Sequence, residues 1–350
     1  MCVAGLAGVL SRVMRSPIGA HALTVAEAAQ ALAKGHLVAF PTETVYGLGA
    51  RADDDAAVAG IFQAKGRPAD HPLIVHVLDQ AGAQAFASEL PPVALRLIKA
   101  FWPGPITVIV PRRADVARAC AGGQDSIGLR CPAHPVAREL LAQALALGVP
   151  GIAAPSANRF GRVSPTTACH VSEEFGDAVP VLEGGACEAG IESAIVDCTR
   201  GQPVLLRPGT VDRAALEHAA GQALRERDAA APRASGTLES HYAPLAKLRL
   251  LAAGDWDQAL RQVMAAWAAG RSSAALALYS TVCPAGAAVP GLRWRRMPHR
   301  PHEVAHELFA VLRELDAWLA QQGGGEIWVE EPPAGPHWEG VRDRLSRAAA

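Results

Sequence analysis

Length, composition and charge limit what this chain can be. It has 350 residues, of which 50% are hydrophobic, and a formal net charge of -1. That length suggests about two domains, each able to bury a sizeable core. The charge excludes a global positive field that would attract nucleic acid, so any RNA contact would need a local basic patch.

The cysteines and the apolar runs narrow the class of protein further. The seven cysteines are dispersed and form no CxxC pair, which argues against a disulfide framework or a structural zinc site. Free thiols fit a reducing compartment, and we predict a cytoplasmic protein. No apolar run is long enough for a membrane span, and we expect residues 1–20 to form a loose extension.

The first part of the chain predicts a mixed α/β domain over residues 21–225. In chain order the pattern predicts a helix at 24–34, a strand at 36–40, a helix at 53–64, strands at 72–77 and 106–110, a helix at 135–146, strands at 151–154, 194–197 and 203–207, and a helix at 211–225. Because strands and helices alternate irregularly, we expect a mixed sheet rather than a regular βαβ array.

A linker and a second domain follow. Residues 226–240 are rich in Ala, Pro, Ser and Gly without an apolar period, so we place a linker at 226–246. Strands at 248–251, 274–279 and 326–330 and helices at 256–269 and 302–321 predict a small three-layer, Rossmann-like α/β domain at 247–350. Its first strand-to-helix turn lacks GxGxxG, so we expect no dinucleotide site there.

Two early segments place polar groups where a ligand could bind. Residues 41–49 (PTETVYGLG) put hydroxyls and glycines directly after a buried strand, which suits a polar ligand but also an ordinary capped connection. Lys65 and Arg67 lie in a segment stiffened by prolines. Cations held in this way suit a triphosphate, although a solvated basic loop is the alternative.

A later segment combines hydroxyls with an amide. Ser156 and Asn158 follow a short apolar strand, and Ser164 precedes a helix that we expect to begin at Pro165. The helix N-terminus would favour phosphate. Two helix caps are the simpler explanation, and they account for Ser164 better than for Asn158.

Two more arginines follow strands and precede prolines. Arg207 has this arrangement, and Arg130 repeats it in the segment that begins at Ser126. Together with Lys65 and Arg67 they could balance a carboxylate and several phosphates. The chain has no GxSxG, HExxH or GxxxxGK[ST] motif. Catalysis would therefore depend on positioning and charge neutralisation.

Seven segments resemble a known family: PTETVYGLGA, KGRPADHPLIVHV, FWPGPITVIV, SIGLRCP, APSANRFGRVSPTT, IESAIVD and LRPGTV. In this order and spacing they are similar to the YrdC-type domain of threonylcarbamoyl-AMP synthases over residues 24–215. The segment HYAP at 241–244, the second domain and residues 340–347 resemble the long, two-domain form. The resemblance implies a twisted mixed β-sheet with a concave basic cavity that holds threonine and ATP side by side.

The resemblance also implies roles for individual residues. The implied L-threonine contacts are Thr44, His76, Arg130, Ala154 and Ser193. The implied ATP contacts are Lys65, Arg67, His71, Ser126, Ser156, Asn158, Ser164, Arg207, His241 and Tyr242. Lys65 and Arg67 would also be the catalytic residues. The linker would close over the nucleotide, and Glu43 is the pocket carboxylate that we consider as a base or water holder.

The implied reaction needs no protein nucleophile and no metal held by the protein. The amine of threonine adds to bicarbonate or carbon dioxide, and the resulting carboxylate attacks the α-phosphorus of ATP and releases pyrophosphate. Mg²⁺ would travel with the triphosphate. A separate transferase would then modify an adenosine of tRNA, and the enzyme itself could contact RNA weakly.

The sequence departs from the family pattern at three places, and it leaves two rival functions to consider. His71 stands where Asn is commoner, Ala194 replaces a usual Thr, and residues 142–150 are longer than usual. One rival function is an RNA-binding YrdC-type module without catalysis. The other is a paralogue that acts on a different substrate.

Overall fold

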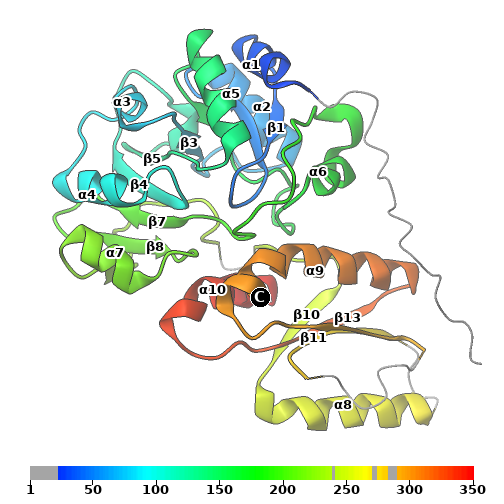
Figure 1. The fold of residues 1–350 in the computed structure, drawn as a ribbon. Coiled ribbons are helices and arrows are strands. Elements are labelled where there is room, and N and C mark those ends of the chain that lie inside the picture. Colours follow the sequence, from blue (N-terminus) through cyan, green and yellow to red (C-terminus); the bar gives the residue numbers. More distant parts are fainter. Residues whose placement is uncertain (1–22, 239–240, 270–273, 283–289) are drawn as a thin grey trace, which may run out of the picture.

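The computed structural model describes residues 23–238, 241–269, 274–282 and 290–350. Two α/β units lie one above the other, joined by a single crossing of the chain (Figure 1). The extension predicted at residues 1–20 lies outside the described residues. Within the described ranges, no helix combines the length and apolar character that crossing a membrane requires.

A nine-stranded sheet forms the first unit, in the order β1-β2-β6-β3-β5-β4-β7-β8-β9. The strands are β1 (Val38–Phe40), β2 (Gly47–Arg51), β3 (Ile74–His76), β4 (Ile106–Pro111), β5 (Ser126–Arg130), β6 (Ile152–Ala153), β7 (Ala194–Asp197), β8 (Val204–Arg207) and β9 (Arg225–Glu226). The pairs β3–β5, β4–β7 and β8–β9 are parallel and the other pairs are antiparallel. The prediction of a mixed sheet is confirmed.

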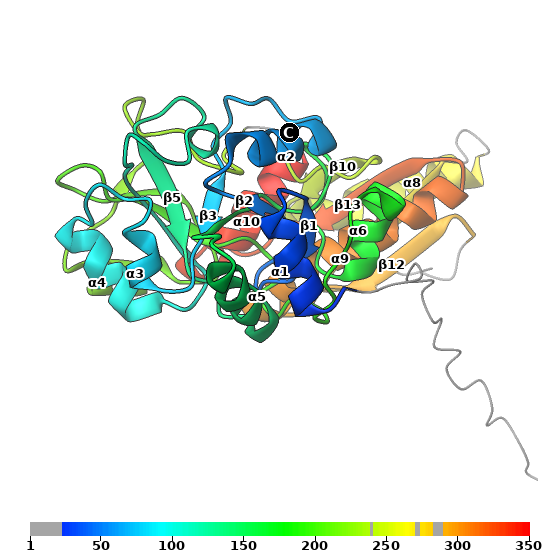
Figure 2. The same ribbon diagram turned by 90° about the horizontal axis from the view of Figure 1, so that it is seen from above.

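Helices cover this sheet as α1 (Val25–Ala33), α2 (Asp55–Lys65), α3 (Gln80–Ala83), α4 (Pro92–Phe101), α5 (Pro135–Ala146), α6 (Ala168–Phe175) and α7 (Arg213–Ala220), with short 3₁₀ turns at Ala119–Ala121 and Gly176–Ala178. Thr24 begins α1 with a capping box, and the carboxylate of Asp54 caps α2. Packing follows the strand pleat: Val38 and Phe40 face α1 and α5, which lie side by side (Figure 2), and Ala39 faces the larger core.

Two predicted helix bounds are wrong for local reasons. The helix expected from Pro165 begins at Ala168, because Thr167 is its N-cap and accepts a hydrogen bond from the backbone of His170. The helix expected over residues 211–225 ends at Ala220. Gly221 follows in the left-handed conformation, with φ of 68°, and stops the helix.

The second unit is a three-layer domain, as predicted. Its sheet has the order β10-β13-β11-β12 and all its pairs are parallel. The elements are β10 (Lys247–Leu251), α8 (Ala253–Ala268), β11 (Ala275–Ser280), β12 (Leu292–Arg296), α9 (Pro301–Gln321), β13 (Gly325–Glu330), a 3₁₀ turn (Pro336–Trp338) and α10 (Glu339–Ala348). Leu276 and Leu278 pack toward α8, whereas Ala277 and Tyr279 pack toward α9 and α10.

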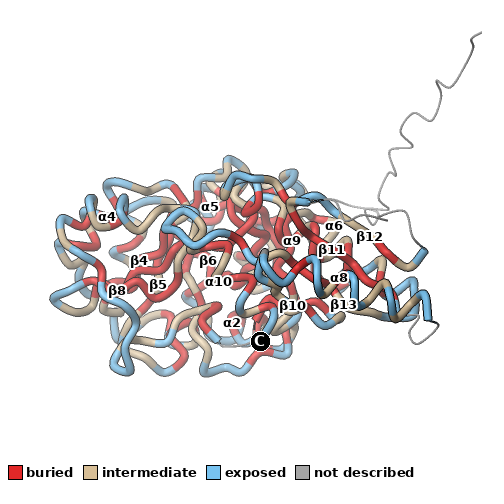
Figure 3. The backbone as a smooth tube through the Cα atoms, turned by 90° about the horizontal axis from the view of Figure 1, so that it is seen from below, coloured by how far each residue is buried: buried red, intermediate tan, exposed pale blue. Residues whose placement is uncertain are grey.

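The two units share a hydrophobic core. Val45 and Ile191 from the first unit and Tyr242 from the linker pack with Leu308 of α9 and Val341 of α10. Buried residues, red in Figure 3, are consequently found in both units and in the region between them. This packing fixes the linker against both units.

Candidate active site

The ends of several strands bring the predicted ligand-binding residues together. His76 at the end of β3 is the register partner of Arg130 at the end of β5. Arg207 ends β8, and Ser193 directly precedes β7, the neighbour of β8. Because the side chains at these positions converge on one region of the sheet, residues far apart in sequence can line one cavity.

The space between the residues of this cavity measures about 480 Å³, which includes solvent at its open side. Its lining combines hydroxyls, arginines, histidines and one carboxylate: Thr42, Thr44, Val45, Gly47, Arg67, Ile74, His76, Arg130, Ala154, Pro155, Ser156, Glu192, Ser193, Arg207, Ser235, Gly236, His241 and Tyr242. All the residues predicted to contact threonine are in this set. Of the residues predicted to contact ATP, Arg67, Ser156, Arg207, His241 and Tyr242 are in it, whereas Lys65, His71, Ser126, Asn158 and Ser164 are not.

Arg130 is held by an ion pair beside the hydroxyls. Its Nη2 lies 2.6 Å from Oε1 of Glu43, and its Nη1 donates to Oγ1 of Thr44 at 2.8 Å. Oγ1 of Thr44 also lies 2.8 Å from that of Thr42. The second oxygen of Glu43 accepts from the backbone of Ala133 at 3.0 Å. Glu43 is thus committed to these partners and lies outside the cavity lining, so it is poorly placed to act as the base or water holder that we considered.

His76 contributes a neutral imidazole to the same end of the cavity. Burial, with a further contribution from Arg130, lowers the pKa of His76 to about 3. Its Nδ1 has no hydrogen-bond partner among the described residues. Nearby, Oγ of Ser193 lies 2.8 Å from Oγ1 of Thr107, a β4 residue that the sequence analysis did not identify. This end of the cavity offers donors and acceptors for a small polar molecule.

Arg67 and Arg207 are buried, and neither forms an ion pair with another described residue. Nη2 of Arg67 donates to the carbonyl of Pro72 at 3.1 Å, and its buried Nε has no partner within the described ranges. Arg207 donates to the carbonyls of Ser193 at 3.0 Å and Ser235 at 2.9 Å. Burial lowers the pKa of Arg67 to about 10, so it stays charged at neutral pH. Two buried cations whose hydrogen bonds, within the described part of the chain, go only to neutral groups favour an anionic ligand.

Lys65 lies beneath the cavity instead of in its lining. Its buried Nζ donates to the carbonyl of Ser156 at 2.6 Å and also to the carbonyl of Asn158. Burial, assisted by Arg67, holds the pKa of Lys65 well below its usual value. The amide of Asn158 donates to the carbonyls of Arg159 at 2.7 Å and Arg162 at 2.8 Å. Lys65 and Asn158 therefore fold the loop that presents Ser156 to the cavity.

Three other predicted contacts also lie outside the lining. Ser164 is not a helix cap, because its Oγ donates to Oε1 of Glu192 at 2.5 Å. His71 is half-buried against the ring of Phe160, 5.4 Å away between centroids. Ser126 begins β5, opposite Pro111 and at the far end of the strand from Arg130. These three side chains do not line the cavity, and their contact with a nucleotide stays a prediction.

The linker forms one wall of the cavity, where the resemblance placed it. Tyr242 is buried in the left-handed conformation, with φ of 66°, and its ring stacks on Phe309 of α9 at 5.4 Å. His241 packs edge-on against Tyr242 at 4.2 Å between ring centroids. Burial lowers the pKa of His241 to about 3 and raises that of Tyr242 to about 12, so both are neutral at physiological pH.

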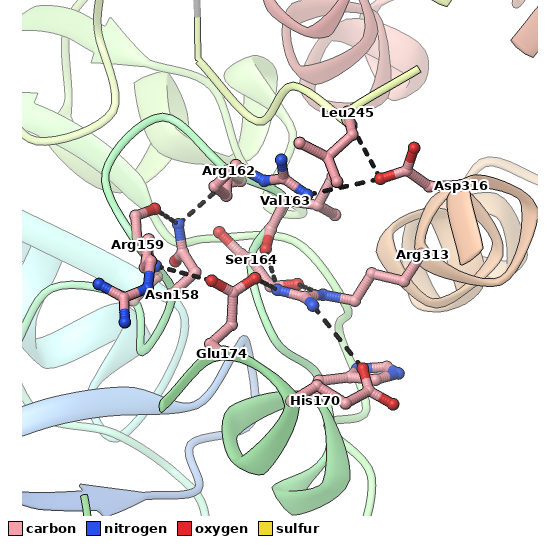
Figure 4. A network of polar contacts seen from close by, with 12 residues as sticks. Asn158, Arg159, Arg162, Val163, Ser164, His170, Glu174, Leu245, Arg313 and Asp316 are labelled. Carbon is pink, nitrogen blue, oxygen red and sulfur yellow. Dashed lines mark hydrogen bonds and ion pairs between the residues drawn. The ribbon is translucent and has the colours of Figure 1, made fainter. Parts of the chain in front are cut away.

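Helix α9 of the second unit holds the loop that carries Ser164 (Figure 4). The guanidinium of Arg313 donates to Oε1 of Glu174 at 2.8 Å and to the carbonyl of Val163. Asp316, one turn later, accepts from the backbone of Leu245 and of Ala246, each at 2.8 Å. The second unit thus fixes both the loop that carries Ser164 and the end of the linker.

Two residues of the site have no short-range signal in the sequence. Glu192 lines the cavity, and its Oε2 accepts from Nε of Arg344, a fully buried residue of α10, at 2.8 Å. Burial opposes ionisation of Glu192, but Arg344 and Arg207 outweigh it and hold the pKa of this carboxyl below its usual value. In the segment GIES, Glu192 lies just before a buried strand. Because a buried carboxylate needs a cationic partner, this position is the hint in the sequence that an arginine such as Arg344 lies nearby.

Comparison with known proteins agrees with this geometry. Residues 30–209 match the sequence family described as "Telomere recombination", and residues 211–350 match the family described as "Threonylcarbamoyl-AMP synthase, C-terminal domain". The threonylcarbamoyl-AMP synthase of Pyrococcus abyssi is 43% identical over 242 residues, which cover 67% of this chain and 70% of that protein.

Two further likenesses extend over most of the chain. The threonylcarbamoyl-AMP synthase of Schizosaccharomyces pombe is 34% identical over 362 residues, covering 89% of this chain and 85% of that protein. The crystal structure of P. abyssi Sua5 complexed with L-threonine has a TM-score of 0.82 at 34% identity, covering 93% of this chain and 94% of that one. This chain therefore belongs to the threonylcarbamoyl-AMP synthase family.

Proposed function

We propose that this protein forms threonylcarbamoyl-AMP and pyrophosphate from L-threonine, bicarbonate or carbon dioxide, and ATP. One observation carries the proposal: Arg67 and Arg207 are buried in the cavity lining without a counter-ion in the described part of the chain, beside a pocket of hydroxyls and neutral imidazole. Such a cavity suits a polyanion lying next to a small zwitterion. The proposed product would be consumed by a separate transferase that modifies tRNA adenosine.

At one end of the cavity, Arg130 would bind the carboxylate of threonine. Its pairing with Glu43 orients the guanidinium, and Nη1 and Thr44 Oγ1 already bond at 2.8 Å. Neutral His76 and Ser193 would contact the rest of the amino acid, and the Cβ of Ala154 would bound its side chain. A neutral imidazole beside the substrate amine avoids the repulsion that a protonated one would cause.

Arg67 and Arg207 would neutralise the phosphates, and Arg207 also donates to the carbonyl and the hydroxyl of Ser193, which links the two substrate positions. Arg67 donates to the carbonyl of Pro72, and its Nε has no partner among the described residues. Arg207 is fixed by two carbonyls, so both arginines are held before the ligand arrives. Developing charge at the α-phosphorus would be stabilised by cations that need not reorganise. Lys65 would assist by holding the loop of Ser156 in place.

No residue need act as a nucleophile in this reaction. The amine of threonine adds to carbon dioxide, and one carboxylate oxygen of the product attacks the α-phosphorus of ATP as the bond to pyrophosphate breaks. Tyr242 and His241 would shield the product from water. Binding two substrates in one cavity raises their effective concentration, which is the main catalytic resource available here.

Magnesium would enter with the triphosphate. Among the described residues, no group of three or more His, Cys, Asp or Glu side chains could hold a metal ion. The carboxylate of the lining, Glu192, is already bonded to Ser164 and Arg344. The phosphates of ATP would therefore be the main ligands of Mg²⁺.

The proposal can be tested directly with the purified protein. Incubation with ATP, Mg²⁺, labelled bicarbonate and each amino acid in turn should release pyrophosphate with threonine and transfer the label to an adenylate. Equal release with every amino acid would point to a paralogue with another substrate. A salt-sensitive gel shift with RNA and no pyrophosphate release would instead support the RNA-binding alternative.

A further inference from the structure

The last helix of the second unit reaches into the active site through one arginine. Arg344 is fully buried, and it donates from Nε to Oε2 of Glu192 at 2.8 Å and from Nη2 to the carbonyl of Glu192 at 3.1 Å. Its Nη1 donates to Asp343 at 2.6 Å. The guanidinium carbon lies 5.3 Å from the centre of the Tyr242 ring. One side chain thus contacts both a cavity carboxylate and the linker.

Glu192 carries a negative charge in a cavity that would bind phosphate, which is also negative. Among the described residues that line the cavity it is the only acid, and it shares that lining with Arg67 and Arg207. An unbalanced carboxylate there would repel a triphosphate and compete for Arg207. The bond from Ser164 to its other oxygen, 2.5 Å long, fixes the carboxylate but adds no positive charge. Arg344 supplies that charge.

Close backbone contact places Arg344 in reach of Glu192. A Cβ at Gly340 would lie 2.4 Å from the carbonyl oxygen of Gly209, so α10 can pack this closely only with glycine there. Residues 340 and 344 lie on the same face of the helix, one turn apart. The approach at Gly340 therefore aims Arg344 at the catalytic unit, and no flexible segment is involved.

We propose that Arg344 is a positioning residue for the nucleotide half of the cavity, acting through Glu192. It binds and neutralises the carboxylate, which leaves the charges of Arg207 and Arg67 available to the phosphates. The second unit is then part of the catalytic apparatus, because the charge balance of the site depends on its last helix. This inference rests on the function proposed above.

The test compares ATP and threonine as substrates. R344M should raise KM for ATP about tenfold or more, because one unbalanced charge then faces the phosphates, and KM for threonine should change much less. R344K keeps the positive charge but loses the planar guanidinium that donates two hydrogen bonds to Glu192. It should raise KM for ATP less than R344M does. The matched control is R342M, which removes an arginine of the same helix that pairs with Glu331 away from the cavity.

A double variant separates this role from simple stabilisation. Adding E192Q to R344M removes the unbalanced charge, so KM for ATP should return toward the wild-type value. Equal increases in both KM values, or no rescue by E192Q, would overturn the proposal. If R344M does not fold, R344Q and R344Q/E192Q, in which residue 344 is also neutral, give the same comparison. Absence of pyrophosphate release by the wild-type protein would refute the proposed function instead, so the two failures are distinguishable.

Discussion

Lys65 and Arg67 are two residues apart in one motif, yet the structure predicts different consequences when each is replaced. In Lys65→Met, the carbonyls of Ser156 and Asn158 lose a buried donor. Each buried acceptor left without a partner costs about 1–3 kcal/mol. Relief of the buried charge offsets part of this loss, since burial already holds the pKa of Lys65 low. We expect a fall of about 2–4 kcal/mol in the free energy of unfolding.

Arg67→Met should behave in the opposite way. The guanidinium makes one hydrogen bond, to the carbonyl of Pro72 at 3.1 Å, and has no ion pair within the described ranges. Its removal should change the free energy of unfolding by about 1 kcal/mol or less. Pyrophosphate release should nevertheless fall to background, because a cation facing the phosphates is lost.

The two variants are distinguished by urea unfolding with and without saturating ATP and Mg²⁺. Ligand at 100 times its dissociation constant stabilises the native state by about 2.7 kcal/mol. Wild type should show that increment, Arg67→Met should lose it, and Lys65→Met should keep part of it from a lower baseline. The reasoning is refuted if Lys65→Met has wild-type stability, or if Arg67→Met is destabilised as strongly as Lys65→Met.

Three further predictions follow from burial and close contacts. The pKa of His76 is about 3 in the folded protein and 6.5 in an unfolded chain, so the unfolded state binds more protons between these two values. Lowering the pH below 6.5 should therefore reduce the free energy of unfolding, by about 2 kcal/mol from this group at pH 5. His76→Gln should flatten the pH dependence of Tm. Gly236→Ala should raise KM for ATP, because its Cβ would lie 2.3 Å from Oη of Tyr242. Gly340→Ala should lower the free energy of unfolding in urea despite the better helix propensity of alanine, because its Cβ would lie 2.4 Å from the carbonyl of Gly209.

Each of these predictions has a control in the same chain. His299→Gln makes the same replacement at an exposed histidine and is the matched control for His76→Gln. Gly123→Ala places a Cβ in open space at a φ of 80°, so it carries the left-handed strain of Gly236→Ala without the clash. Gly254→Ala lies in α8 with nothing near its Cβ, and it should stabilise the protein by up to about 1 kcal/mol. Gly340→Ala behaving like Gly254→Ala would contradict the close approach of α10.

Local signals explain why much of the fold could be predicted. The predicted helix at residues 135–146 has the observed bounds, since Pro135 opens it and its apolar residues follow a helical period. β2 (Gly47–Arg51) was not predicted, because two glycines in the segment suggested a ligand-binding turn. α10 was also missed: much of its surface is charged, and the buried Arg344 and Gly340 do not look like core residues in the sequence.

The site was harder to predict than the fold, for a physical reason. A sequence motif identifies side chains that are fixed in place, but it does not identify what they contact. Lys65 and Arg67 look equivalent in the sequence, yet Lys65 contacts two backbone carbonyls, whereas Nε of Arg67 has no partner in the part of the chain that the structure describes. The pair Glu192–Arg344 joins positions separated by 152 residues, and no local pattern encodes such a contact.

The four buried arginines in and around the cavity differ in their partners, and this difference suggests different roles for them. Arg130 and Arg344 each have a carboxylate partner, Glu43 and Glu192 respectively, at 2.6 and 2.8 Å. An arginine in a buried pair is held in one orientation, but much of its charge is already balanced. Arg67 and Arg207 are instead held by neutral carbonyls, which orient the guanidinium and leave its charge for a ligand. The paired arginines therefore set the geometry of the cavity, where Arg130 would still donate hydrogen bonds to the carboxylate of threonine, and Arg67 and Arg207 would supply the attraction for the phosphates.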